Sequence, residues 1–454
     1  MSRNPTRPRI LCVAHGTIES NSGGVEVYQR LIAEQLRDQF EFLFFAPDLN
    51  GGARGSYVLY SLESDLRESY TPEPPVLPEH ASHPGLERIF SDILKRHQVA
   101  LVHFHHLLRQ VPSLPAVARG CGVPVVLSVH DFFAVCDEYN LLTEEGRYCG
   151  VLDQVPVDCD SCLYGLRGYK KGSQGKRRSA HEEALRNSDQ VVFNTIGIRD
   201  QFQTVFRNLD RSRTRVIGAP SGTRFQAPVA RSLEGPLRVL IPNGLSRLKG
   251  GDALCDLVGS TRGLPIEYHF FGRTDRDYPE HRVSGLNSQI HLHGAYTRAD
   301  LEAFAPSAHL SIHASIWPET YCISLSEMWD LGLVPIASKI GALGERITAG
   351  VNGFLVPPGD AGAMKEILYR MLDNRASLEC IRANLGPGLS TSAESCASAM
   401  RALYVESMEM ARGKLSSGPD QGPIPTGSPT TWSTGRGPKS RRIRKWLQRF
   451  DIQG

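Results

Sequence analysis

The chain has 454 residues, of which 41% are hydrophobic and 22% charged, and its formal net charge is +3. This length suits two or three domains that each bury a core, and the composition is that of a soluble globular protein. No apolar run approaches the roughly 18–20 residues of a membrane-spanning helix, and the N-terminus leads into a strand rather than a signal-peptide core. We therefore expect a cytoplasmic protein.

Residues Arg9–His15 predict a short apolar strand, which runs into a glycine-rich loop and then a helix from Val27 onward. The pair Gly23 and Gly24 lets the backbone approach a ligand without interference from a Cβ atom. The same pair also suits a tight turn, so the loop alone leaves both interpretations open.

Strands alternate with helical segments through the rest of the first half. Strands are predicted at residues 41–46, 100–105, 124–130, 190–194 and 214–217, with a helix at 86–97 among the intervening segments. This alternation predicts an α/β fold with a parallel, doubly wound sheet. The stretch 50–84 is rich in Gly, Pro, Ser and Glu, and we expect it to be irregular.

Histidines gather at the ends of two predicted strands. His130 precedes Asp131 at the end of one strand, and His103, His105 and His106 close the strand before it. Adjacent residues of a strand point to opposite faces, which disfavours a triple-histidine metal site. A histidine at the carboxyl end of a strand is either structural or a substrate contact.

Four cysteines lie close together in sequence, at Cys136, Cys149, Cys159 and Cys162. In a cytosolic chain such clustering favours a metal over disulfides, and four thiolates around one zinc would pin a loop that lacks a core of its own. We expect a structural zinc site, with unliganded thiols, disulfides or another metal as the alternatives.

A basic segment follows, in which six Lys and Arg side chains lie among Gly and Ser between Arg167 and Arg178. This segment is either a solvated loop or a basic lip that attracts an anionic acceptor or a phospholipid surface.

The most informative stretch lies in the second half of the chain, after the predicted strand Leu310–His313. A turn with a proline carries Glu319 at the carboxyl end of this strand, where open parallel sheets bind ligands. A helix begins next, so the backbone N–H groups of residues 321–324 form an anion site. Glu327 lies about two helical turns beyond Glu319, within reach of a second part of the same ligand.

Several motifs around this stretch occur together. They are the Glu319-x7-Glu327 spacing, "GLVPIAS" at 332–338, "GALGE" at 341–345 and "NGFLVPPGD" at 352–360. This set resembles the nucleotide-sugar site of retaining glycosyltransferases of family 4, of the bacterial type that builds polysaccharides and lipopolysaccharides. The resemblance implies the GT-B fold, two Rossmann-like domains that face each other across a cleft.

The resemblance also implies roles for individual residues. Glu319 contacts the transferred sugar, Glu327 holds the ribose of the nucleotide, and Lys249 neutralises the diphosphate. His130 matches a histidine near the transferred sugar. The implied catalytic set is Glu319, His130 and Lys249, and the implied donor-binding set is Gly23, Gly24, Arg247, Lys249, Tyr321, Cys322, Ile323 and Glu327.

One part of the family pattern is absent. The family places an Arg directly after the first Gly of its diphosphate-binding loop, whereas this chain has Leu245 after Gly244. Arg247 and Arg273 are the nearby substitutes. The resemblance implies no metal for catalysis.

The expected domain organisation follows from these elements. It comprises a tail at 1–8, an N-terminal domain at 9–225 with the cysteine loop 136–162, a hinge at 226–236, a nucleotide-sugar domain at 237–395, a helix at 396–412 and a disordered tail at 413–454. The tail holds eight Lys and Arg against two Asp. Within it, Ile443, Trp446, Leu447 and Phe450 have the spacing of an amphipathic helix, which predicts peripheral binding to the anionic inner face of the cell membrane.

We therefore expect a glycosyltransferase that moves a hexose-type sugar from a nucleoside diphosphate sugar to a glycan or lipid-linked acceptor, with retention of the anomeric configuration. Nucleic acid is not an expected partner. Two alternatives remain open at this point: a catalytically inactive GT-B scaffold, which the absent Arg would suit, and a nucleotide-sugar 2-epimerase.

Overall fold

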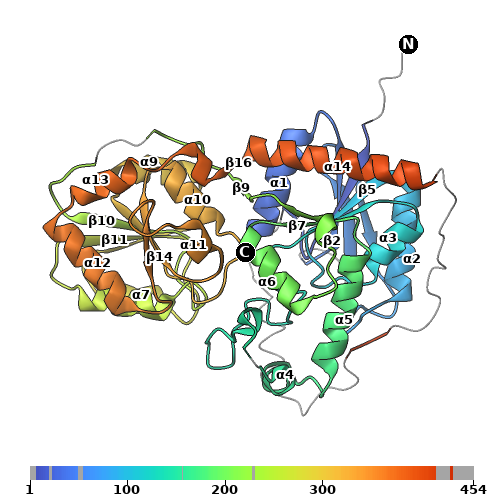
Figure 1. Ribbon diagram of the computed structural model, residues 1–454, viewed down its shortest axis with the longest axis horizontal. Coiled ribbons are helices and arrows are strands. Elements are labelled where there is room, and N and C mark those ends of the chain that lie inside the picture. Colours follow the sequence, from blue (N-terminus) through green and yellow to red (C-terminus); the bar gives the residue numbers. More distant parts are fainter. Residues whose placement is uncertain are drawn as a thin grey trace. The chain divides into compact units, whose positions relative to one another are not determined.

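The computed structural model of the protein describes residues 7–19, 23–49, 55–155, 157–227, 231–415 and 430–432 (Figure 1). Two compact units divide the chain. Unit 1 comprises residues 1–217 and 396–454, and unit 2 comprises residues 218–395. The first division lies at the end of the strand predicted at 214–217, nine residues before the stretch proposed as the hinge.

Unit 1 is built on an eight-stranded sheet in the order β4-β3-β2-β1-β5-β6-β7-β8. Its strands are β1 Arg9–Val13, β2 Glu41–Pro47, β3 Tyr57–Ser61, β4 Arg67–Tyr70, β5 Val99–Phe104, β6 Val125–Ser128, β7 Gln190–Phe193 and β8 Thr214–Val216. Its helices are α1 Gly24–Leu36, α2 Pro84–Arg96, α3 Leu114–Gly120, α4 Cys159–Arg167, α5 Ser173–Arg186, α6 Ile196–Val205 and most of α14 Ala393–Leu415.

The structure corrects the expectation that residues 50–84 are irregular. Strands β3 and β4 lie within this stretch and extend the sheet by antiparallel pairing, with Phe45 of β2 opposite Leu59 of β3. All five residues of β3 are buried, and its pairing with β2 and β4 satisfies backbone groups that an edge strand would leave unpaired.

Unit 2 contains a six-stranded parallel sheet in the order β12-β11-β10-β13-β14-β15 and a two-stranded sheet of β9 and β16. Its strands are β9 Pro220–Ser221, β10 Leu237–Ile241, β11 Ile266–Phe271, β12 Ile290–Gly294, β13 Leu310–His313, β14 Val334–Ser338, β15 Phe354–Val356 and β16 Thr391–Ser392. Its helices are α7 Gly251–Ser260, α8 Glu280–Ser284, α9 Arg298–Phe304, α10 Ile323–Asp330, α11 Gly341–Arg346, α12 Ala361–Asp373 and α13 Ser377–Arg382.

Both faces of the unit 2 sheet are covered by helices. Val239 and Ile241 of β10 pack in a core that includes α7 and α12, whereas Leu240 between them packs in a separate core with α9 and α10. This alternation follows from the two-residue period of a strand. The predicted fold class, two doubly wound α/β domains of the Rossmann type, is confirmed.

A short segment of the C-terminal tail packs on unit 1, although the sequence predicts disorder for residues 413–454. Thr431 forms an antiparallel bridge with His80, and Trp432 is 4% exposed in a cluster with Leu163 and Tyr169. Burial of the large indole explains the departure from the predicted disorder. The predicted amphipathic segment 440–450 lies outside the described residues.

Among the described residues, no helix is both long and apolar enough to cross a membrane.

Candidate active site

Lys249 and Glu319, which lie 70 residues apart in sequence, form an ion pair in unit 2. The Nζ atom of Lys249 lies 2.9 Å from Oε1 of Glu319. The pair depends on Gly250, whose φ of +76° and close approach to Ala314 leave no room for a side chain. A backbone hydrogen bond of 3.0 Å from the Ile316 N–H to the Leu248 carbonyl oxygen fixes the same approach, so two of the sequence-predicted site residues lie side by side.

The Glu319 carboxylate is buried and hydrogen-bonded. Its relative exposure is 5%, and the Ser315 hydroxyl donates to Oε1. Burial alone would raise the pKa of Glu319, but the charge of Lys249 and these hydrogen bonds outweigh burial and lower it. The carboxylate is therefore ionised at neutral pH and able to accept hydrogen bonds from hydroxyl groups.

A second glycine holds the turn that presents Glu319. Gly341 has a φ of +53°, and a Cβ atom there would lie 2.7 Å from the Glu319 carbonyl oxygen. The N–H of Ala342 donates to that oxygen at 2.8 Å. The "GALGE" motif thus supports the Glu319 turn through the backbone at the start of α11 (Figure 1).

Arg346 organises the start of α10, a role that sequence reasoning missed. Its guanidinium donates to the carbonyl oxygens of Tyr321 at 2.8 Å and Cys322 at 3.2 Å, and it lies 3.8 Å from the centre of the Tyr321 ring. Cys322 has a left-handed backbone with φ of +65°, and Ile323 opens the helix. With these carbonyl oxygens bound to Arg346, the helix start can present its N–H groups to an anion.

Glu327 lies in the middle of α10 and is half-buried. Among the described residues, no group donates a hydrogen bond to its carboxylate. Burial, together with the negative charge of Asp330, raises the pKa of Glu327 to about 7, although Arg298 acts in the opposite direction. A partly buried carboxylate without a partner is costly, which is the property expected of a group that receives ligand hydroxyls.

The loop after β10, which lacks the Arg of the family pattern, is held by Asn243. Asn243 has a left-handed backbone with φ of +70°, and its side-chain amide donates to the Ser324 hydroxyl at 2.8 Å. The two substitute residues, Arg247 and Arg273, are both exposed. The loop after β10 is therefore tied to the start of α10 by the Asn243 amide.

In unit 1, His130 lies among other aromatic groups at the carboxyl ends of β5 and β6. Its Nε2 atom is 3.2 Å from Nδ1 of His105, and its ring centre is 4.8 Å from that of Tyr28. Burial lowers the pKa of His130 to about 3, and the neighbouring His106 acts in the same direction, outweighing the opposite effect of Asp131. The ring is therefore neutral at physiological pH.

His106 and Asp131 form a pair next to His130. Nδ1 of His106 accepts a hydrogen bond from the Leu108 N–H at 2.9 Å, so the ring proton lies on Nε2, which is 2.9 Å from Asp131. A cavity of about 40 Å³ is lined by these residues together with Phe133 and others. Sequence reasoning predicted only His130 here, because the cluster forms where separate strands end side by side.

The glycine pair of unit 1 opens α1. Gly23 is the N-cap residue, with an extended backbone, and Gly24 is the first helical residue. The helix buries Glu26, whose carboxylate lies 3.5 Å from His15. The loop residues 20–22 that precede the pair lie outside the described residues.

The four cysteines of the predicted zinc site are all partly buried in unit 1. Within the described residues, no three of their sulfur atoms lie within 4.8 Å of one another. Burial raises the pKa of Cys136 to about 12 and of Cys162 to about 11, so both thiols hold their protons. This arrangement does not fit a closed tetrahedral zinc site, and zinc at these cysteines stays a prediction from the sequence.

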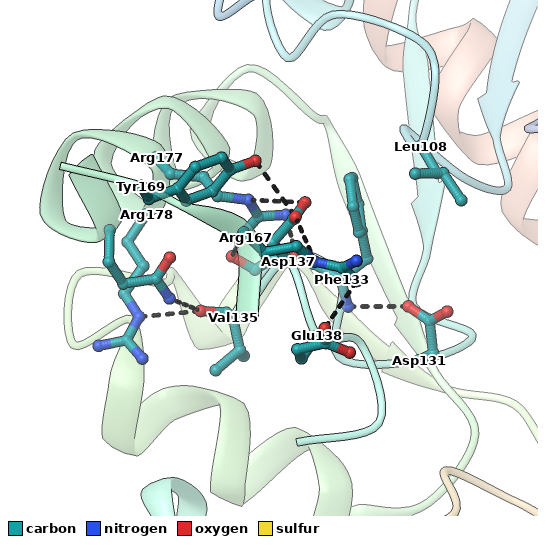
Figure 2. A network of polar contacts seen from close by, with 12 residues as sticks. Leu108, Asp131, Phe133, Val135, Asp137, Glu138, Arg167, Tyr169, Arg177 and Arg178 are labelled. Carbon is teal, nitrogen blue, oxygen red and sulfur yellow. Dashed lines mark hydrogen bonds and ion pairs between the residues drawn. The ribbon is translucent and has the colours of Figure 1, made fainter. Parts of the chain in front are cut away.

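The sequence predicts that the basic segment between Arg167 and Arg178 is either a solvated loop or a basic lip. Neither description fits the whole segment, because half of its basic side chains point inward. Figure 2 shows that Arg167, Arg177 and Arg178 point inward, toward Asp137, Glu138 and Val135. Arg167 lies 3.3 Å from Asp137 and 2.7 Å from Glu138, and Arg178 donates to the Val135 carbonyl oxygen at 2.9 Å. Three of the six basic side chains therefore bind acceptors inside unit 1.

Two family matches cover most of both units. Residues 22–219 match Glycosyltransferase Family 4, and residues 239–374 match Glycosyl transferases group 1. No curated protein matches the sequence significantly.

Solved structures with similar folds cover nearly the whole chain. Anabaena Alr3699/HepE in complex with UDP-glucose is 18% identical with a TM-score of 0.54, over 90% of this chain and 99% of that one. Sucrose-phosphate synthase from Thermosynechococcus elongatus is 17% identical with a TM-score of 0.60, over 90% and 100%. WaaG, a glycosyltransferase involved in lipopolysaccharide biosynthesis, is 16% identical with a TM-score of 0.56, over 86% and 98%.

At these sequence identities the structural similarity shows only the fold. The two family matches show the class of enzyme. The protein is a glycosyltransferase with the GT-B fold. Unit 1 carries the match to family 4, and the comparisons favour neither the inactive scaffold nor the 2-epimerase.

Proposed function

We propose that the protein transfers a hexose-type sugar from a nucleoside diphosphate sugar to a hydroxyl group of a glycan or lipid-linked acceptor, with retention of the anomeric configuration. The observation that carries this proposal is the arrangement in unit 2. There the half-buried Lys249 pairs with the buried Glu319 beside a helix start. Inside that helix lies Glu327, whose carboxylate accepts no hydrogen bond from the described residues.

Each group has a chemical role in this proposal. Lys249 stabilises the negative charge that develops on the leaving diphosphate, and the N–H groups at the start of α10 add to this stabilisation. The ionised Glu319 orients sugar hydroxyls, and Glu327 accepts hydrogen bonds from the ribose. Arg247 is the proposed substitute for the absent Arg, because it lies two residues before Lys249.

The role of unit 1 in the proposal concerns the sugar and the acceptor. A neutral His130 can donate one hydrogen bond to a sugar hydroxyl without placing a positive charge near an oxocarbenium-like centre. We assign the Gly23-Gly24 helix start to the same function. The described residues of the two units supply no evident protein nucleophile, so we propose a transfer in which the binding geometry of the two substrates dominates.

A panel of nucleoside diphosphates tests the donor site. UDP is the first candidate, because the HepE structures contain UDP and UDP-glucose. At a hundred times its dissociation constant, the correct nucleotide should stabilise the folded protein by about 2.7 kcal/mol in a thermal-shift assay that also includes GDP, ADP and TDP. The Glu327→Ala variant should lose most of this shift, whereas Glu366→Ala, on the exposed side of α12, should keep it.

If no nucleotide shifts the folded wild type, the inactive scaffold replaces the enzyme as the better proposal. Turnover gives the second readout, since slow hydrolysis of the donor sugar should accompany binding and should be lost in Glu319→Ala. The anomeric configuration of the first transferred sugar, measured by NMR, tests retention separately.

We also propose that the tail segment 440–450 binds anionic membranes, on the sequence pattern alone. Its five basic residues would contribute roughly 1 kcal/mol each near an anionic surface. Cosedimentation with phosphatidylserine vesicles should be lost when the chain is shortened to residue 438, and an unchanged result would contradict this proposal.

A further inference from the structure

One face of the unit 2 sheet carries a group of side chains that the donor site does not use. Glu267, His269 and His291 each offer a ligand atom, and these atoms lie within 4.8 Å of one another. Among the described residues, no other three His, Cys, Asp or Glu side chains meet that condition.

The strand pairing explains why these residues meet. Glu267 and His269 are two positions apart in β11, so both point to the same face of the sheet. Strand β12 pairs with β11 in parallel, with His291 opposite His269. His293, two residues further along β12, lies on that face as well, and Phe304 of α9 packs against the His269 ring.

His269 is the buried member of the group and has an unused nitrogen. It is 7% exposed, and within the described part of the chain its Nε2 atom has no hydrogen-bond partner, although it lies 3.6 Å from the Glu267 carboxylate. Its other nitrogen, Nδ1, lies 3.1 Å from Nε2 of His293. When Nδ1–H donates to His293, the Nε2 lone pair points toward Glu267, and a metal-bound histidine is commonly oriented by such a second hydrogen bond.

The other two members of the group are a carboxylate, Glu267, and an exposed imidazole, His291. Glu267 is held by Arg238, whose Nε lies 2.7 Å from its Oε2 atom. His291 is exposed, and its ring stacks on His269 with centroids 4.4 Å apart and an angle of 12°. Parallel rings direct their lone pairs side by side, so His291 must turn about its Cβ–Cγ bond to share a ligand with His269. Its exposure permits that movement.

We propose that Glu267, His269 and His291 form a binding site for a divalent transition-metal ion, with water completing the coordination. Two imidazoles and one carboxylate form a set that suits Zn²⁺, Co²⁺ or Ni²⁺ better than Mg²⁺ or Ca²⁺. The metal would link β11 to the edge strand β12. It would therefore act on the stability of unit 2 and not on the transfer chemistry.

A Co²⁺ titration of the full-length protein, followed by absorption spectroscopy, tests this site. Co²⁺ bound by nitrogen and oxygen gives visible d–d bands alone, whereas cysteine thiolates add an intense charge-transfer band in the near ultraviolet. We expect visible bands without the thiolate band, and affinity at least about tenfold weaker in His291→Gln. The matched control is His281→Gln, on the exposed side of α8, which should bind as the wild type does.

Two outcomes would overturn the proposal. One is the absence of Co²⁺ binding, which would leave the stacked histidines as packing groups only. The other is binding that His291→Gln does not weaken; if the thiolate band appears and Cys159→Ser removes it, the cysteine loop holds the metal instead. Because His291 is exposed, its substitution should leave unit 2 folded, and nucleotide binding at the donor site serves as the check.

Discussion

Two regions of the molecule concentrate charged side chains in partly buried surroundings. One is the donor segment of unit 2, which we define as Lys249 together with residues 315–332, and the other is segment 132–178 of unit 1, which contains the cysteine loop. In segment 132–178 the buried Asp137 is shared by Arg167 at 3.3 Å, Arg177 at 3.8 Å and the Tyr169 hydroxyl at 3.1 Å (Figure 2). In the donor segment, Glu327 has no such partner among the residues that the structure describes.

The difference separates a structural network from a binding site. A buried charge with several partners inside the protein stabilises the position of its loop and has little capacity left for a ligand. A partly buried carboxylate without partners carries a desolvation cost that ligand hydroxyls can relieve. The proposed donor site therefore depends on the pairing of each charged group and not on the number of charges in a segment.

The largest effect should follow from Asp137→Asn. This substitution preserves shape but leaves Arg167 and Arg177 without their shared carboxylate, which should lower the free energy of unfolding by about 3–5 kcal/mol. Urea denaturation measures the loss. Removing the exposed Glu183–Arg186 pair with Glu183→Gln should cost no more than about 1 kcal/mol. Equal effects of the two substitutions would contradict the structural role of Asp137.

Substitutions in the donor segment should lower the catalytic activity. Lys249→Met should lower kcat by at least about 10²-fold, since one charge that stabilises the leaving group is lost. This single variant also leaves Glu319 buried without its counter-ion, so it should be less stable than the wild type. The double variant Lys249→Met/Glu319→Gln removes both charges and should regain stability while remaining inactive. A double variant with restored activity would show that the pair is only structural.

Local sequence signals were sufficient for two elements of unit 2 that precede residues 315–332. Strand β13 and helix α9 have the bounds that apolar periodicity predicts, Leu310–His313 and Arg298–Phe304. Arg346 was missed because it binds the backbone carbonyl oxygens of Tyr321 and Cys322, and a carbonyl oxygen leaves no mark in the sequence.

Long-range pairing explains what could not be predicted in unit 1. Strands β3 and β4 are short and lie near Gly and Pro, and they become strands only by pairing with β2. The His106–Asp131 pair joins the ends of β5 and β6, and His15 from the end of β1 lies 4.7 Å from the His106 ring. Such neighbours are defined by strand order, which one sequence does not reveal.

A smaller effect is expected when Glu327 is replaced by Gln. Loss of hydrogen bonds to a charged acceptor should weaken nucleotide binding by about 1.5–3 kcal/mol, measured by calorimetry. In the wild type, affinity should fall as the pH drops through about 7, the pKa of Glu327, because the protonated carboxyl is a poorer acceptor. The Gln variant should lack this dependence, and a wild-type profile that is flat from about pH 5 to pH 8 would contradict the ribose role.

The free energy of unfolding should depend on pH in the opposite direction to the nucleotide affinity. The folded pKa of Glu327 lies above the ordinary value of 4.5, so the folded protein binds more protons than the unfolded chain between these values. Stability in the wild type therefore falls as the pH rises through this window, and Glu327→Gln avoids that loss. The variant should melt at a higher temperature than the wild type near pH 8, with a smaller difference near pH 5.

The smallest effect on the free energy of unfolding is expected for Trp432→Ala. The free energy gained by burying the indole is nearly cancelled by the entropic cost of ordering the tail segment. Burying an aromatic side chain contributes roughly 2–3 kcal/mol, and Arg177 lies 5.7 Å from the indole centre, which adds a cation–π interaction. Ordering three residues of the tail costs about 1–2 kcal/mol each. Trp432→Ala should therefore detach the segment Thr430–Trp432 while lowering the free energy of global unfolding by no more than about 1 kcal/mol.

Hydrogen exchange at one amide can detect this detachment. The N–H of Ala81 donates to the Thr430 carbonyl oxygen at 2.7 Å, so it should exchange faster in Trp432→Ala. The N–H of Glu87, bonded to His83 at the start of α2, should be unaffected. Trp446→Ala, elsewhere in the tail, should leave both amides as in the wild type. Unchanged exchange at Ala81 in Trp432→Ala would mean that the backbone pairing with residues 79–82, and not the indole, holds the tail segment on unit 1.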